Sequence, residues 1–188
     1  YYLNALKQIL FSFITQWGRQ NKEILPDTVC YSLIHQPYIN YYHWIFESLT
    51  RLIILDNANI DNTLIIPENL KNIEYIKDTL NLLGVRNYKI VGTDKLVFAK
   101  KLALPEIVRW GGHHDPEILL KLRTRLLNAF SGCNFTNDSP ERLFVKRNGR
   151  RKIANFNDIE NILEKYDFKV LDFEGMSVYQ QIGIMQGV

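Results

Sequence analysis

The chain has 188 residues, of which 46% are hydrophobic and 23% charged, and its formal net charge is +3. This is an ordinary globular composition, sufficient for the core of one large domain or two small ones. The mild basic excess requires no polyanionic partner such as nucleic acid, and no apolar run approaches the roughly 20 residues that span a bilayer.

The cysteines indicate the redox state of the compartment, and the first residue indicates whether the chain is a fragment. The two cysteines, Cys30 and Cys133, are too far apart to suggest a disulfide framework or a zinc pattern, so we expect a reducing compartment. No signal peptide is visible, and the chain begins at Tyr1 instead of a methionine. We therefore expect a fragment of a longer protein.

Up to residue 130 the sequence alternates between helical and strand patterns. Asp115 followed by Pro116 marks the start of a helix, and Gly84 marks the end of another. Hydrophobic periodicity and turn residues give the remaining elements. We predict helices over 1–19, 40–52, 69–83 and 115–130, strands over 28–35, 62–67, 88–92 and 95–105, and a turn over 92–94.

A polar segment from Ser131 to Pro140 is rich in turn residues and is the best linker in the chain. Strands that alternate with helices indicate parallel sheets. We therefore predict an α/β protein with two Rossmann-like units. A first domain spans 1–130, a linker spans 131–141, and a second domain over 142–188 is incomplete. The second domain is expected to hold strands at 142–147 and 168–173 and helices at 157–166 and 177–186, with Ser177 as the cap of the last helix.

The helix that begins at Asn40 carries a polar stripe. At 3.6 residues per turn, four polar side chains fall within about 80° of one another: Asn40, His43, Glu47 and Arg51. The opposite side holds Tyr42, Ile45, Leu49, Leu52 and Ile53. Trp44 falls beside Arg51 on the polar side, where an aromatic ring is suited to stack on the flat face of a sugar.

Plainer interpretations compete with a binding site on this helix. His43 and Glu47 are four residues apart, so they can form an ordinary surface pair worth a few tenths of a kcal/mol. The zinc-protease pattern needs two histidines around the glutamate, and here there is one. His113 and His114 are possible additional ligands, but a His-His pair in a Gly-rich loop is more often a plain turn. We therefore expect no metal site.

A basic segment follows the first strand after the linker. In open α/β sheets ligands bind at the carboxyl ends of strands, and arginines can grip phosphate oxygens in bidentate fashion. A solvated loop is the plain alternative. The sequence has neither a glycine-rich phosphate fingerprint nor an Asp-x-Asp pair for a metal–diphosphate complex. The basic residues of the segment are Lys146, Arg147, Arg150, Arg151 and Lys152.

With both motifs in hand, the chain resembles glycosyltransferase family 61. This family includes bacterial capsular-polysaccharide transferases, plant xylan xylosyltransferases and animal O-linked N-acetylglucosamine transferases. Its first signature, Asn-x-Tyr-His-x-x-x-Asp/Glu, matches Asn40, Tyr42, His43 and Glu47. Thr50 stands at the proline of the Leu-Pro-Arg-Leu that follows in the family.

The second half of the chain carries the rest of the resemblance. The family's second signature, a strand ending in Ser-Arg before further arginines and an asparagine, is similar to residues 142–155, with Lys146 in place of the serine. Residues 175–188 are similar to the helix that precedes the family's His-Gly-Ala segment. That segment itself is missing, so the resemblance implies that this chain alone is inactive.

The resemblance implies a two-domain GT-B fold and an inverting glycosyltransferase that uses no catalytic metal and no cofactor. Its implied catalytic residues are Glu47, as the base for the acceptor hydroxyl, and His43. The implied substrate-binding residues are Asn40, Trp44, Arg51 and His113, and the implied ligands of the donor's nucleotide and phosphates are Arg147, Arg150, Arg151 and Asn155.

The implied partners are a nucleotide-sugar and a glycan or lipid-linked glycan acceptor, in the synthesis of a capsular or other surface polysaccharide. The implied location is cytoplasmic, with peripheral association at the inner face of a bacterial membrane left open. A non-catalytic α/β module that binds a sugar or a protein is the alternative. A nucleic-acid interface is not expected, because no aromatic residue lies between Lys146 and Lys152.

Overall fold

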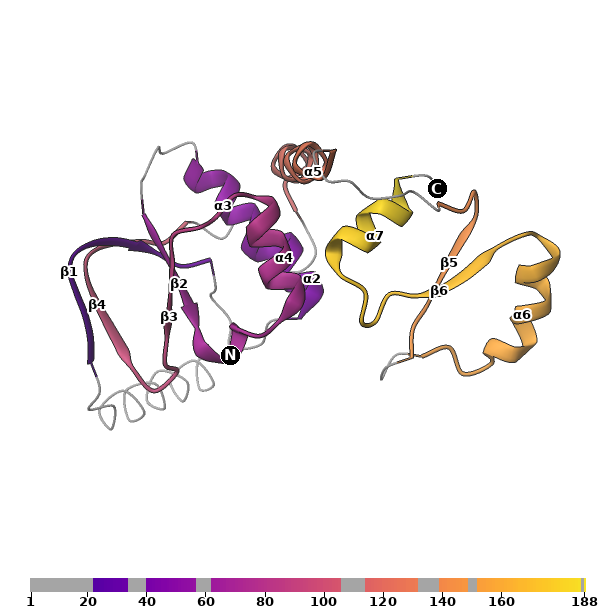
Figure 1. Ribbon diagram of the computed structural model, residues 1–188, viewed down its shortest axis with the longest axis horizontal. Coiled ribbons are helices and arrows are strands. Elements are labelled where there is room, and N and C mark those ends of the chain that lie inside the picture. Colours follow the sequence, from indigo (N-terminus) through magenta and orange to yellow (C-terminus); the bar gives the residue numbers. More distant parts are fainter. Residues whose placement is uncertain are drawn as a thin grey trace, which may run out of the picture. The chain divides into compact units, whose positions relative to one another are not determined.

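The computed structural model describes residues 22–33, 40–56, 62–105, 114–131, 139–148, 152–186 and 188 (Figure 1). Helices and strands alternate along these ranges, and the strand pairs in them are parallel. The predicted α/β class with parallel sheets is therefore confirmed for this part of the chain. The helix predicted over 1–19 lies outside the described residues.

Contacts along the chain divide it into two compact units. The first consists of Tyr1–Ile73 and Val85–Leu122, and the second of Glu74–Gly84 and Arg123–Val188. Most of the predicted linker over 131–141 lies outside the described residues, so the predicted domain boundary stays a prediction.

The first unit holds a parallel sheet with the strand order β3-β2-β1-β4. The chain builds it outward from β1 through β2 to β3 and then returns to the other side of β1. The order therefore reverses between β1 and β4, and such a switch point is where open α/β sheets bind ligands, beyond the carboxyl ends of the strands. The strands are β1 (Lys22–Tyr31), β2 (Thr63–Pro67), β3 (Tyr88–Val91) and β4 (Leu96–Ala103).

The strand β1 is longer than the sequence predicted, and it bends. Its pairing with β4 shifts register between Leu25 and Val29, and Figure 1 shows the two strands curving together. The predicted strand began after Pro26, because proline usually ends a central strand. The register shift lets β1 pass through this proline and continue back to Lys22.

The bend explains how a short turn can join β3 to β4, which do not pair with each other. Lys95 N–H donates to Gly92 O over 3.1 Å, which confirms the predicted turn. Glu23 on β1 accepts ion pairs from Lys89 of β3 at 2.6 Å and from Lys95 at 3.0 Å. The hydrogen bonds from these two lysines lower the pKa of Glu23, and the pairs link the two ends of the curled sheet.

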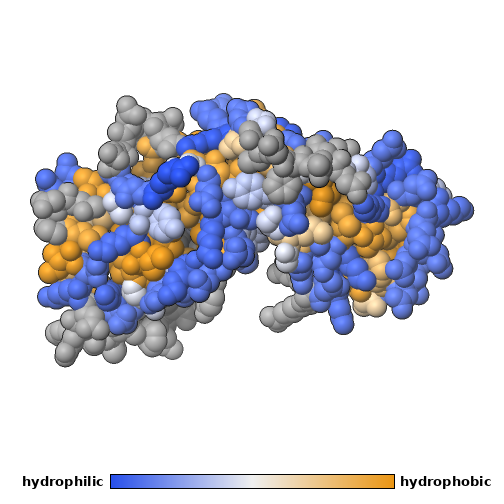
Figure 2. Space-filling view, viewed as in Figure 1, coloured by the Kyte–Doolittle hydropathy of each residue, from blue (hydrophilic) through white to orange (hydrophobic). Residues whose placement is uncertain are grey.

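Apolar side chains fill the interior of the first unit and also reach its surface. Cys30 and Leu64 are buried in the sheet, and burial raises the pKa of the Cys30 thiol, which is free. Ile24 on β1 and Phe98 and Leu102 on β4 are exposed, and Figure 2 shows hydrophobic surface over this part of the unit. Apolar surface on an edge strand favours association with another segment or molecule.

The second unit combines helices with a two-stranded parallel sheet of β5 and β6. The helix predicted over 69–83 is divided into a 3₁₀ turn over Glu68–Leu70 and α4, and Gly84 ends α4 at a φ of 72°. The unit's elements are α4 (Glu74–Leu82), the end of α5 (Pro116–Ser131), β5 (Leu143–Lys146), α6 (Phe156–Lys165), β6 (Lys169–Asp172) and α7 (Val178–Met185).

The last helix packs on other helices of the second unit. Val178 of α7 is buried in a cluster with Leu82 of α4 and Phe130 of α5. The Val178 N–H also donates to Asp78 Oδ2 over 2.8 Å. These contacts give α7 a packing partner that does not depend on further strands.

The N-terminus of α7 carries a complete capping box, as the serine in the sequence predicted. Ser177 Oγ accepts the Gln180 N–H at 3.2 Å, and Gln180 Oε1 accepts the Ser177 N–H at 2.9 Å. We expect Ser177→Ala to lower the free energy of unfolding by about 1 kcal/mol, measured by urea denaturation. Ser177→Asp keeps a capping oxygen and should stay near the wild type. No loss in Ser177→Ala would show that the cap contributes nothing, and equal losses in both variants would show that the loss does not come from the capping oxygen.

Candidate functional site

Two connections that follow β1 and β4 meet in the first unit. The helix beginning at Tyr41 follows β1, and His114 precedes α5, which follows β4. The Tyr42 hydroxyl and His114 Nε2 share a hydrogen bond of 2.8 Å. Asp115 caps α5 by accepting the Glu117 N–H at 2.9 Å, which fixes the backbone beside His114. A residue that follows β1 and a residue that follows β4 in the chain are therefore joined.

The helix after β1 consists of three consecutive pieces. They are α2 (Tyr41–His43), a π-helical turn η1 (Trp44–Ser48) and α3 (Leu49–Asp56). Asn40 is the N-cap, and its Oδ1 accepts the His43 N–H at 3.0 Å. The side chain that was predicted to bind substrate therefore holds the first turn of the helix in place.

The π-helical turn is the feature of this helix that the sequence did not reveal. The Leu49 N–H reaches the Trp44 carbonyl, five residues back, so this turn carries one residue more than an α-helical turn. The Thr50 hydroxyl donates to the carbonyls of Phe46 and Glu47, each at 3.0 Å. Thr50, which replaces a proline of the resembled signature, therefore supports the wide turn. Such turns occur frequently at functional sites.

The extra residue makes part of the predicted polar stripe wrong. Trp44 is only 1% exposed and Arg51 only 4%, whereas Tyr42, predicted on the packed side, is 43% exposed. A regular period of 3.6 residues cannot describe both sides of a π-turn, so residues before and after it rotate relative to each other. Trp44 belongs to the hydrophobic core rather than to a surface on which a sugar could stack, because its ring is buried.

His43 and Glu47 remain together across the turn. His43 Nδ1 lies 2.9 Å from Glu47 Oε1, and the side chains are 32% and 15% exposed. The ring nitrogen has no aligned hydrogen-bond partner among the described residues, so the contact is a close approach rather than an aligned bond. A partly exposed carboxylate with an imidazole beside it has the composition of a general base and its partner.

Arg51 interacts with the charge of Glu47 and is hydrogen-bonded to the segment that follows β1. Its Nη1 donates to the Leu33 carbonyl at 3.1 Å, two residues beyond the last residue of β1. Its Nη2 is buried and has no hydrogen-bond partner among the described residues. Burial lowers the pKa of Arg51, and the charge of Glu47 acts in the opposite direction. Arg51 thus supplies a buried positive charge that interacts with Glu47.

An aromatic cluster that the sequence did not predict lies beside His43. Tyr42 stacks on Phe46 with ring centroids 5.0 Å apart, and His114 lies 5.4 Å from Phe46 and 5.8 Å from Tyr42. Tyr42 also meets the His43 ring edge-on at 5.5 Å. Two signals in the sequence pointed to this cluster: the spacing of four between Tyr42 and Phe46, and the His-His pair before α5.

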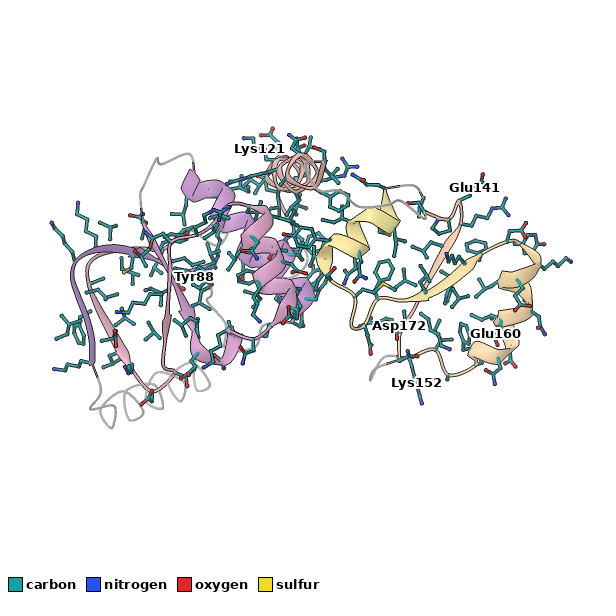
Figure 3. The ribbon with its side chains drawn as sticks, viewed as in Figure 1. Tyr88, Lys121, Glu141, Lys152, Glu160 and Asp172 are labelled. Atoms are coloured by element: carbon teal, nitrogen blue, oxygen red, sulfur yellow. The ribbon has the colours of Figure 1, made fainter. Side chains whose placement is uncertain are left out.

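The described beginning of the basic segment lies at the carboxyl ends of β5 and β6 in the second unit. Lys146 and Asp172 are register partners at the ends of these strands, and the Asn148 side chain donates to Asp172 Oδ2. Figure 3 shows Asp172 and Lys152 toward one end of this unit and Glu141, which precedes β5, toward the other. The polar side chains are therefore placed where the strand-end rule expects a ligand.

The individual residues of this segment differ in their surroundings. Arg147 is exposed directly after β5, whereas the Lys146 ammonium lies 3.9 Å from the centre of the Phe156 ring. Asn155 precedes α6, and its side chain does not cap the helix. Arg150 and Arg151, together with His113 of the predicted substrate set, lie outside the described residues.

The described ranges contain neither a cluster of metal-ligand side chains nor a membrane-spanning helix. No group of three or more His, Cys, Asp and Glu side chains that could hold a metal ion occurs there. No helix within these ranges is long and apolar enough to cross a membrane.

The comparisons with known proteins agree with the motifs of the first unit and the basic segment. A family model described as Glycosyltransferase 61 matches residues 41–188, a range that includes the π-turn, the His43–Glu47 pair, part of the first unit and all of the second. No curated protein and no solved structure matches the chain.

Proposed function

Because the chain belongs to glycosyltransferase family 61, we propose that it transfers a sugar from a nucleotide-sugar donor to a glycan acceptor. In this proposal the anomeric carbon is inverted, no metal takes part, and the two units belong to a GT-B arrangement. Surface polysaccharide is the proposed product, and cytoplasmic synthesis, with peripheral contact to the membrane, the proposed setting.

The observation that carries the proposal is the His43–Glu47 pair, with Nδ1 and Oε1 2.9 Å apart, on the helix that follows β1. A carboxylate that is 15% exposed can contact a substrate while remaining partly desolvated. The buried guanidinium of Arg51, which interacts with the charge of Glu47, supplies a positive charge near this carboxylate.

The proposed reaction is a single displacement. The acceptor hydroxyl oxygen attacks the anomeric carbon while Glu47 removes its proton, with His43 orienting the carboxylate. The bond between the anomeric carbon and the diphosphate oxygen breaks, and its electron pair leaves with the nucleoside diphosphate. One displacement places the new bond on the opposite face of the sugar and inverts the configuration.

Charge on the leaving diphosphate needs stabilisation from the protein if no metal is present. We assign this role to Arg147, Arg150 and Arg151, since guanidinium groups bind phosphate oxygens in bidentate fashion. Asn155 precedes the N-terminus of α6, where backbone N–H groups and the helix dipole favour an anion.

A donor screen on the full-length protein that carries this chain tests the proposal. Common nucleotide-sugars are incubated with glycan acceptors, and release of nucleoside diphosphate is recorded. We expect one donor to give release that increases when an acceptor is added. A non-catalytic module would bind sugar or partner without any release, and that result across the donor panel would contradict the proposal.

A further inference from the structure

We propose that Tyr42, stacked on Phe46 and hydrogen-bonded to His114, forms the platform on which the acceptor's sugar ring stacks beside Glu47. The inference rests on the proposed function and deepens it by assigning an acceptor subsite. The three aromatic side chains are called the aromatic platform below.

The aromatic platform offers an exposed ring at a fixed angle. Tyr42 is 43% exposed although Phe46 stacks on it with an interplanar angle of 29°. The bond of 2.8 Å between the Tyr42 hydroxyl and His114 Nε2 restrains the other end of the ring. A tyrosine held in this way loses little conformational freedom on binding, so more of the contact energy appears as affinity.

The position of the platform identifies which sugar it would hold. The Tyr42 ring lies 5.5 Å from the His43 ring, and His43 in turn lies 2.9 Å from Glu47. A pyranose whose C–H face covers Tyr42 would therefore have hydroxyl groups at its edge within reach of the pair. The group that Glu47 deprotonates belongs to the acceptor, so the ring beside it is an acceptor ring.

The π-turn is the reason that Tyr42 can serve in this way. On a regular helix Tyr42 would share the packed side with Leu49 and Leu52, which are 0% and 3% exposed. Because the π-turn contains one more residue than an α-helical turn, side chains before it and after it face in different relative directions than they would on a regular helix. Trp44, the ring that the sequence suggested for stacking, is instead 1% exposed.

The test measures glycan binding without requiring turnover. Saturation-transfer NMR with methyl glycosides of glucose, galactose, mannose and xylose is recorded on the full-length protein, and Kd is obtained by titration for the glycoside that binds best. We expect Tyr42→Ala to weaken this binding about tenfold, which corresponds to about 1.4 kcal/mol. Tyr42→Phe keeps the ring and should stay within about threefold, since a ring face supplies most of the contact.

Tyr88 of β3 is the matched control, because it is an equally accessible tyrosine at 47% exposure (Figure 3). Tyr88→Ala should bind the glycosides as the wild type does, and an unchanged thermal midpoint shows that each variant is folded. The proposal is overturned if no glycoside binds the wild type, or if Tyr42→Ala binds the glycosides as well as the wild type does.

Kinetics separate this inference from the proposed function. If transfer occurs, Tyr42→Ala should raise KM for the acceptor and leave KM for the donor unchanged; a rise in the donor KM alone would refute the acceptor assignment. If glycosides bind through Tyr42 but no donor is ever cleaved, the platform stands and the transferase proposal fails.

Discussion

Replacing Glu47 by glutamine should lower the turnover number for sugar transfer by about 10²-fold or more. Glutamine has the shape of glutamate but cannot accept the acceptor's proton, so only the basicity of the side chain is removed. A factor of 10² corresponds to about 2.7 kcal/mol of lost transition-state stabilisation. The measurement is the initial rate of nucleoside diphosphate release by the full-length protein at saturating acceptor.

Glu74→Gln is a suitable control for this variant. Glu74 also lies on a helix and is paired with a basic residue, Lys77, at 3.1 Å, but its side chain is 75% exposed. Its replacement should leave the rate within about twofold of the wild type, since surface pairs of this kind contribute little. Near-normal turnover in Glu47→Gln would show that another group removes the proton.

The second large effect is expected at the end of β5. Arg147→Ala should weaken binding of the nucleotide-sugar by roughly 1.5–3 kcal/mol, the range for a hydrogen bond to a charged group. This is a rise in Kd of about 10- to 150-fold, measured by titration calorimetry. Arg147 is exposed, so the fold should tolerate the change.

Arg123 on α5 provides the comparison for Arg147. It is an exposed arginine of the same unit, and Arg123→Ala should bind the nucleotide-sugar with the wild-type affinity. If both variants bind as the wild type does, the diphosphate is not held by Arg147. If both lose affinity equally, the effect is one of net charge rather than of a specific contact.

The elements that the sequence predicted best are those whose ends are marked by capping residues. Asp115, Ser177 and Gly84 marked a helix start, a second start and a helix end, and each makes the expected local structure. Caps depend on neighbours a few residues away, so they can be read without knowing the tertiary structure. Parallel pairing followed in the same way from the alternation of strands with helices.

Features that depend on contacts between distant residues could not be predicted. The bend of β1 depends on its pairing with β4. The hydrogen bond between Tyr42 and His114 depends on the strand order that brings their segments together. Trp44, at the start of the π-turn, and Arg51, after it, are buried, although a regular helical period placed both on the polar side. Glu47 and His43 kept their predicted proximity although His43 directly precedes the π-turn and Glu47 lies within it.

The central claim is a single displacement in which one base, Glu47, activates the acceptor. The anomeric configuration of the first product, determined by proton NMR before any mutarotation or secondary reaction, tests it most directly. The account predicts that the new glycosidic bond has the configuration opposite to that of the sugar in the nucleotide donor. A product that retains the donor's configuration would contradict it, because one displacement at the anomeric carbon cannot give that result.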